Sequence, residues 1–495
     1  MLFIIIQYSM VVNSISFLLF FIVVFAVYYA PPVAKNVRHQ NLWILLTSYF
    51  LYGYTDLKTL PILITATIAF YLIGKWLKSA MDRGNHQQAS RITTFGVCLG
   101  IGVLLYFKYF NFFAESVKDL MNAVGFHVSW TALHILLPIG VSFFTFKFIS
   151  YIIDIHLKRI EPCSNFIDFA AYIAFFPTIL SGPIDRPGTF FPQLDKRRQF
   201  RYDLATDGFR QILWGMFTKM CIADILSAGV DMVWSNVEAQ NGSAILLATL
   251  LYPIQLYADF DGYSNMAIGT GKILGFHITR NFNHPLLARN IAEYWRCWHM
   301  SLMTWFRDYI YIPLGGSRCA QWKVIRNTLI VFGISGLWHG ASWTFVVWGL
   351  YHGFLIVLYK LLHINTKEKD ILTVGRWLPS TKDLFKMTIT TILVFIGWVL
   401  FRADTFENAV TFMGRLFTPS LFSAPDYPIG ISTLAMIFVL YALEWYQRDK
   451  EYPLQMNPTF LANKKWLPYI IEYIIIAAIV FYGNFEGSQF IYFQF

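Results

Sequence analysis

The chain has 495 residues, of which 56% are hydrophobic, 18% aromatic and only 14% charged, and its net charge is +10. A soluble fold could not bury this much apolar surface, so the composition excludes a soluble globular protein and predicts a multi-pass membrane protein in contact with membrane lipid. The positive charge does not indicate a nucleic-acid partner, because the Lys and Arg residues lie in short loops between apolar runs, where they set membrane topology.

Apolar runs of about 20 residues, the length that crosses a bilayer, recur along nearly the whole chain. We therefore expect an all-α integral membrane protein with about ten to twelve spans. The first run, residues 2–29, has no basic residue before it and is too long for the core of a signal peptide, so we interpret it as a retained span; Met10 would also serve as a start. The basic loops after the first and third runs are expected in the cytoplasm, which places the N-terminus outside.

No sequence feature indicates a separate soluble domain. We expect one domain over residues 1–495, with N-terminal spans in 1–165, a catalytic core in 166–362 and C-terminal spans in 363–495. The five cysteines have no paired spacing, so neither a disulfide framework nor a zinc site is predicted. We expect no metal and no bound cofactor.

Residues 175–187 place three prolines and a glycine in and just after an apolar segment. Such a segment cannot be a plain helix, and broken backbone at membrane depth needs protein or a water-filled cavity around it. We predict a re-entrant or interfacial element that lines a cavity, with an ordinary loop as the alternative. The basic cluster that follows it is expected in the cytoplasm and comprises Lys196, Arg197, Arg198 and Arg201. It could face lipid headgroups or an anionic cofactor, and headgroups are the commoner explanation.

Two carboxylates, Asp259 and Asp261, follow the apolar run 245–256 directly. Paired acids at this depth could carry out proton chemistry or bind a cation. They could equally cap a helix and lock the fold, and this structural interpretation is favoured because no histidine or metal-like spacing lies nearby.

Residues 293–308 predict an amphipathic helix along a membrane interface, with charged residues on one side and Trp298 among the aromatic residues opposite. His299 falls on the apolar side, so we expect it to point toward protein or hydrocarbon. Taken alone, such a histidine is more often a satisfied core residue than a functional one. Pro313 and two glycines then end the helix in a turn before Arg318.

His339 lies in residues 329–359, a stretch without any Lys, Arg, Asp or Glu. An ionisable side chain at membrane depth is costly, so it is a functional-site candidate by default. From the residues alone, catalysis and a satisfied packing role remain equally good interpretations. Trp338 and Trp343 lie close to it in the sequence and would shape and dry a pocket.

Seven segments, in this order and spacing, give the chain a specific resemblance. It resembles the membrane-bound O-acyltransferase family and, within it, the bacterial alginate O-acetylation group. The segments are residues 176–186, 259–269, 281–285, 294–316, 336–343, 397–403 and 490–495.

The resemblance implies a bundle of helices that encloses a funnel or tunnel, with His339 and His299 as the catalytic residues. It implies an enzyme of the bacterial cytoplasmic membrane that moves an acyl group, most simply acetyl, from a thioester to a hydroxyl. Such a transfer needs a base, for which histidine is suited, and no metal or redox group. The remaining candidates are pocket-lining residues, Trp298, Trp338, Trp343, Asp259, Ser181 and Arg186, and basic residues that would dock an anionic donor, Lys196, Arg197, Arg198 and Arg318.

The donor would be acetyl-CoA or the thioester of an acyl carrier protein. The acceptor would be a periplasmic or extracellular partner with a serine nucleophile, which then acetylates an exported polysaccharide. Two alternatives remain: a D-alanyl transferase that acts on teichoic acid, in the same family, and a multi-pass transporter or flippase. A transporter is disfavoured because no matching pair of interrupted segments lies in two halves of the chain. The region from residue 398 to the C-terminus resembles the alginate group and favours acetyl transfer.

Overall fold

The computed structural model describes residues 10, 12–127, 135–364, 377–455, 466–485, 490 and 491. Across these residues the chain forms helices and no strand, as predicted. Part of the first predicted span and most of the terminal segment 490–495 lie outside them. Within the described residues, six helical stretches are long and apolar enough to cross a membrane: Leu60–Asp82, His86–Ala123, Tyr202–Ser235, Gly242–Ile273, Trp343–Leu361 and Thr381–Arg402.

Three shorter apolar helices, Ile15–Tyr29, Ile431–Tyr446 and Tyr469–Tyr482, add to these six. The ten to twelve spans expected from the sequence therefore include apolar runs that fold as helices shorter than a usual crossing. Large apolar side chains are also exposed on the helices; on the first helix, Leu18, Leu19 and Ile22 are each more than half exposed. Exposed apolar side chains of this kind are expected where a helix faces lipid rather than water.

The chain forms two compact units. The first comprises residues 1–205 with 270–278, and the second comprises residues 206–269 with 279–495. Both candidate catalytic histidines belong to the second unit.

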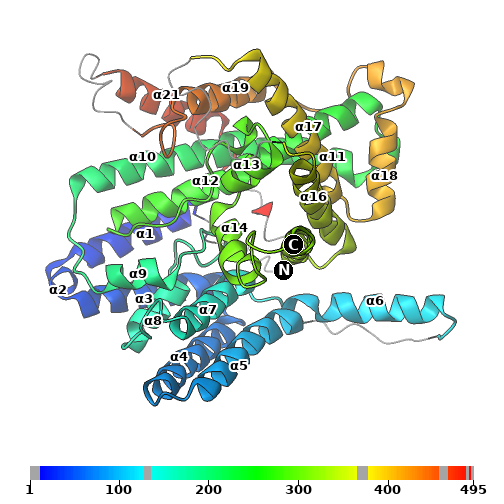
Figure 1. The fold of residues 1–495 in the computed structure, drawn as a ribbon. Coiled ribbons are helices and arrows are strands. Elements are labelled where there is room, and N and C mark those ends of the chain that lie inside the picture. The colour runs from blue at the N-terminus through cyan, green and yellow to red at the C-terminus, as the bar shows by residue number, and fades with distance from the viewer. Residues whose placement is uncertain are drawn as a thin grey trace, which may run out of the picture. The chain divides into compact units, whose positions relative to one another are not determined.

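In the first unit, α4 (Leu60–Asp82), α5 (His86–Leu104) and α7 (Val141–His156) lie side by side (Figure 1). Glycines permit this packing: a Cβ added to Gly100 of α5 would lie 2.8 Å from a side-chain carbon of Ile149 in α7. The other helices of the unit are α1 (Ile15–Tyr29), α2 (Pro31–Ala34), α3 (Val37–Thr55), α6 (Phe110–Ala123), α8 (Phe166–Ala174) and α9 (Pro187–Leu194), with a π-helical turn at Leu105–Tyr109.

The backbone between α8 and α9 is broken, as the prolines predicted. Residues 175–186 form turns and irregular backbone, and residues 175–185 are buried. Part of the compensation for lost helical hydrogen bonds comes from Lys147 of α7, a buried side chain whose Nζ donates to the carbonyl oxygens of Tyr172 at 3.0 Å and Ile173 at 3.4 Å. Protein groups therefore satisfy polar backbone that lipid could not.

Two helices that lie mainly in the second unit, α10 (Tyr202–Thr218) and α12 (Gly242–Ile273), run side by side (Figure 1). A Cβ on Gly215 of α10 would lie 2.5 Å from the carbonyl oxygen of Gly262, so the two backbones touch. The other α-helices that the structure describes in this unit are α11 (Asp224–Ser235), α13 (Ile291–Cys297), α14 (Met300–Phe306), α15 (Gln321–His339), α16 (Trp343–Leu361), α17 (Thr381–Arg402), α18 (Phe406–Arg415), α19 (Ile431–Tyr446) and α21 (Leu467–Tyr482).

Candidate active site

His339 is the last residue of α15, at the tight connection between α15 and α16. Glycines bring these two helices into backbone contact. A Cβ on Gly336 would lie 2.2 Å from a carbonyl oxygen of α16, and one on Gly349 would lie 2.1 Å from a carbonyl oxygen of α15. Small residues at such crossings allow close helix packing in membranes. Gly336, which belongs to the motif at residues 336–343, thus allows the close helix packing that positions the end of α15 and His339.

The imidazole of His339 is only 3% exposed and lies among aromatic rings. Its ring centroid is 5.0 Å from those of Trp338 and Trp348 and 5.4 Å from that of Phe401, which belongs to α17. The rings limit the access of water to the imidazole, a side chain that can act as a base in proton transfer. Three helices therefore build the surroundings of this histidine.

His299 lies between two short helices, α13 and α14, and not within the single helix predicted over residues 293–308. That prediction is wrong at one point: His299 adopts left-handed backbone, with φ 44° and ψ 51°. Such a conformation is strained for a residue with a side chain, at a cost of about 1–3 kcal/mol, and such strain clusters at functional sites. Its imidazole is 1% exposed, as its place on the apolar side predicted, and burial lowers the pKa of His299 to about 3.

One tryptophan connects the two histidines. The ring of Trp338 lies 5.0 Å from that of His339 and 5.8 Å from that of His299. The other side of His299 meets Phe260 of α12 at 4.7 Å. The fold thus brings two imidazoles, 40 residues apart in the sequence, to the same indole ring.

Further tryptophans pack next to the aromatic rings that surround the two histidines. Trp298 is fully buried and lies 5.0 Å from Trp398, which in turn lies 5.5 Å from Trp348. Of the predicted pocket-lining residues, Trp338 therefore contacts both histidines, and Trp298 belongs to the adjoining group of buried rings. Trp343 begins α16 with its side chain 53% exposed, so it is placed differently from the buried tryptophans.

Asp259, another predicted pocket residue, belongs to a buried ion cluster. Its Oδ1 lies 2.7 Å from Nζ of Lys219, which also contacts Asp224 Oδ1 at 2.6 Å. The second oxygen, Oδ2, accepts a hydrogen bond of 2.8 Å from the backbone N–H of Ile491. These side chains are at most 2% exposed. For Asp259 the arrangement agrees with the fold-locking interpretation, since both carboxylates of this cluster lie beside the Lys219 ammonium.

Two predicted pocket residues lie in the first unit, in the broken segment. Ser181 is buried and donates from Oγ to the carbonyl oxygen of Leu180 at 2.7 Å. Arg186 is half-buried at the start of α9.

The basic residues predicted to dock a donor differ in exposure. Lys196, Arg197 and Arg318 are exposed. Arg198 is buried instead: its guanidinium lies 4.7 Å from the ring of Phe276, and Nε donates to Tyr28 Oη at 2.5 Å. Its neighbours hold it inside the first unit, so Arg198 does not present its charge at the surface.

Two buried polar residues near the histidines were not singled out in the sequence. His352 of α16 is fully buried, with ring centroids of Trp295 at 5.0 Å and Trp348 at 5.3 Å, and within the described chain neither ring nitrogen has a hydrogen-bond partner. Its presence in the same uncharged stretch as His339 was the available signal. Ser335 lies one turn before His339 on α15; its buried Oγ also lacks a hydrogen-bond partner among the described residues. The spacing of four residues was its signal.

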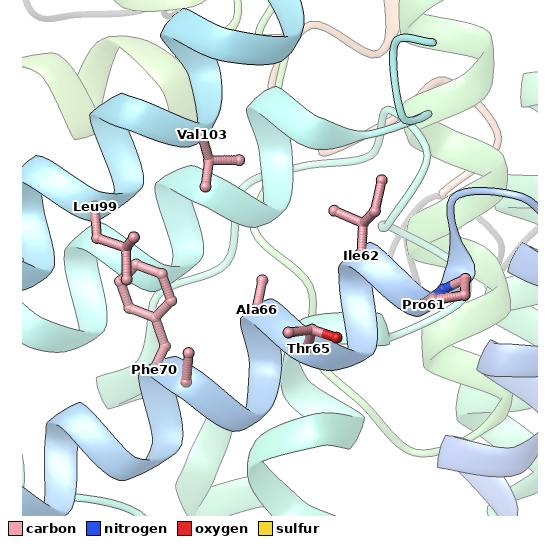
Figure 2. A pocket seen from close by; sticks show the side chains of 8 residues that line it. Pro61, Ile62, Thr65, Ala66, Phe70, Leu99 and Val103 are labelled. Atoms are coloured by element: carbon pink, nitrogen blue, oxygen red, sulfur yellow. The ribbon is translucent and has the colours of Figure 1, made fainter. Parts of the chain in front are cut away.

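A cavity of about 390 Å³ lies between α4 and α5 of the first unit (Figure 2). Its walls are apolar apart from one hydroxyl, that of Thr65, and none of the side chains that line it titrates. They are Pro61, Ile62, Thr65, Ala66, Ala69, Phe70, Leu99 and Val103. This cavity lacks any group that could move a proton, whereas the surroundings of His299 and His339 have two.

The sequence is similar to a known protein family and to several described proteins. A model of the membrane-bound O-acyltransferase family matches residues 161–391, which include both histidines. A protein of Azotobacter vinelandii described as probable alginate O-acetylase AlgI is 35% identical over 461 residues, covering 92% of this chain and 88% of the relative.

Two other relatives have different described activities. A peptidoglycan O-acetyltransferase of Helicobacter pylori is 30% identical over 403 residues, covering 76% of this chain and 73% of the relative. A teichoic acid D-alanyltransferase of Bacillus subtilis is 31% identical over 289 residues, covering 54% of this chain and 70% of the relative.

The fold and the matches define a multi-pass helical membrane enzyme of the acyl-transferring class. More specifically, the chain belongs to the membrane-bound O-acyltransferase family, as the sequence motifs indicated. Membership in an enzyme family removes the transporter alternative.

Proposed function

We propose that this protein transfers an acetyl group from a thioester donor at the cytoplasmic face of a bacterial inner membrane to a hydroxyl acceptor on the outer side, for O-acetylation of an exported polysaccharide. The observation that carries the proposal is the buried pair His339 and His299, joined through Trp338. The pair lies in the family-matched region and combines proton-accepting groups with a dry aromatic surround.

In the proposed reaction, His339 takes the proton of the acceptor hydroxyl as its oxygen attacks the thioester carbonyl carbon. The carbon–sulfur bond then breaks, the ester forms, and the proton passes to the departing thiolate. Burial lowers the pKa of His299 to about 3, so His299 is neutral at physiological pH and can orient the reacting groups or relay the proton. The tryptophans exclude water that would otherwise hydrolyse the thioester.

The donor would be acetyl-CoA or an acyl carrier protein thioester, and both are anionic. The exposed side chains of Lys196, Arg197 and Arg318 would attract either donor if they face the cytoplasm, as the charge pattern predicts together with an outward N-terminus. The acceptor would be a periplasmic or extracellular partner that carries a serine nucleophile and passes the acetyl group to the polymer.

Acetyl transfer is preferred over D-alanyl transfer because of how far the similarity extends. The likeness to the alginate relative covers 92% of this chain, whereas the likeness to the D-alanyltransferase covers 54%. The likeness to the peptidoglycan O-acetyltransferase covers 76% of this chain.

Two experiments test the proposal together. Purified protein in lipid vesicles should release CoA from radiolabelled acetyl-CoA and label an acceptor hydroxyl, while the His339→Asn variant should not. Mass spectrometry of surface polymers from a strain without the protein should show the loss of acetyl from one polymer. Loss of D-alanine with acetyl intact would overturn the acetyl proposal.

A further inference from the structure

The strained turn at His299 is held by a clamp that centres on Asn281. Residues 281–283 run beside residues 297–301, and backbone hydrogen bonds join them: the N–H of Met300 donates to the carbonyl oxygen of Asn281 at 2.8 Å, and the N–H of Asn283 donates to that of Cys297 at 3.0 Å. The two bonds lie on either side of Trp298 and His299. They therefore fix both ends of the left-handed turn.

The side chain of Asn281 completes the clamp. Its Oδ1 accepts from Ser301 Oγ at 2.6 Å, and its Nδ2 donates to Ser264 Oγ of α12 at 3.0 Å. Asn281 is fully buried, and both serines are 2% exposed. An amide is suited to this place because it accepts on one side and donates on the other, whereas a carboxylate would offer no donor to Ser264.

The clamp connects the backbone around His299 to helix α12. Ser264 and Phe260 both belong to α12, and Phe260 lies against the His299 ring at 4.7 Å. Asn281 thus ties the backbone that carries His299 to the helix whose phenylalanine packs on the same imidazole. Without it, the strained residue could relax to ordinary backbone and turn its ring away from Trp338.

We propose that Asn281 is a positioning residue that acts through Ser301 and Ser264 to hold His299 in its left-handed conformation for acyl transfer. This inference rests on the proposed function, because its effect is measured as a loss of transfer rate. A displacement of about 1 Å at a reacting group can cost about 10²-fold in rate, so removal of the clamp should lower kcat by one to two powers of ten.

Rates and thermal unfolding of the purified membrane protein test this clamp. Asn281→Ala and Ser301→Ala should lower kcat with little change in KM for acetyl-CoA, and Ser301→Thr, which keeps the hydroxyl, should restore the rate. Asn327→Ala is the matched control: Asn327 is also fully buried and donates to the carbonyl oxygen of Leu314 at 3.0 Å, away from the clamp. It should lose comparable thermal stability and retain kcat.

The outcomes separate the two proposals. If His299→Asn lowers kcat while Asn281→Ala and Ser301→Ala keep it within about twofold, the clamp is wrong and the proposed function stands. Equal losses of kcat in Asn327→Ala and Asn281→Ala would also overturn the clamp. If wild-type protein transfers no acetyl group, the proposed function fails instead. Should Asn281→Ala fail to fold, Ser301→Ala and Ser264→Ala each remove one hydrogen bond and give the same test.

Discussion

Two of the buried polar clusters described in the second unit are built in opposite ways. In one, Lys219 lies between Asp224 and Asp259, at 2.6 Å and 2.7 Å, so that opposite charges satisfy one another. In the other, His299 and His339 are surrounded mainly by aromatic rings. In the first cluster the charges compensate one another, whereas an imidazole among apolar rings can accept a proton from a reacting group. Burial alone therefore does not identify the reactive cluster; the kind of neighbour does.

The largest effect should come from His339. We expect His339→Asn to lower the acetyl transfer rate by about 10³-fold, the range typical of a lost general base, with little change in the thermal unfolding midpoint. His352→Asn is the matched control, because it removes another fully buried imidazole beside Trp348. Equal rate losses in both variants would mean that the site merely needs intact packing.

The ion cluster should show the reverse pattern. Asp259→Ala leaves Lys219 with one carboxylate instead of two and removes the acceptor for the Ile491 N–H. Because the Ile491 N–H then loses its buried acceptor, we expect a loss of about 1–3 kcal/mol in stability, measured by thermal or denaturant unfolding in detergent. The loss of rate per folded molecule should be much smaller than in His339→Asn. A rate loss as large as that of His339→Asn, without destabilisation, would place Asp259 in the chemistry.

We expect the protein to become less stable as the pH decreases, because His299 is buried with a lowered pKa. Burial lowers its pKa from 6.5 to about 3, so below pH 6.5 the unfolded chain binds a proton that the folded chain does not. Stability should therefore fall as the pH decreases from 6.5 toward 3, by up to about 1.4 kcal/mol per pH unit from this group. The thermal midpoint of His299→Gln should fall less between pH 7 and pH 5 than that of wild type; parallel curves would contradict this assignment.

The smallest effect should come from the exposed charges. Replacement of Lys196 and Arg197 by Ala should raise KM for acetyl-CoA by a few-fold at low salt, and added salt should abolish the difference. Lys58→Ala, a change at an exposed lysine of a loop predicted to face outside, should leave KM unchanged. A KM difference that persists at high salt would argue against electrostatic docking.

Local patterns predicted what depends on local chemistry. The hydropathy pattern predicted the helical membrane fold, and the prolines after Phe176 predicted the broken segment. The burial of His299 followed from its place on the apolar side of residues 293–308. Each feature depends on residues that are neighbours in the chain.

Tertiary contacts decided what the sequence could not predict. The helical period of the sequence continues through Trp298 and His299, so the sequence pattern does not predict the break between α13 and α14. The break coincides with backbone hydrogen bonds to the distant segment 281–283. Arg198 follows two exposed basic residues, yet Tyr28 and Phe276, far away in the sequence, hold it inside. The meeting of His299 and His339 at Trp338 likewise follows from helix packing.

The most direct test of the central claim is a double-mutant cycle on the two histidines. Single-turnover acetyl transfer would be measured for wild type, His299→Asn, His339→Asn and the double variant in lipid vesicles. Residues that act as one unit lose little more together than the more damaging change alone, so we expect the double variant to match His339→Asn. Losses that multiply, or full transfer in His339→Asn, would contradict a joint role for the histidine pair.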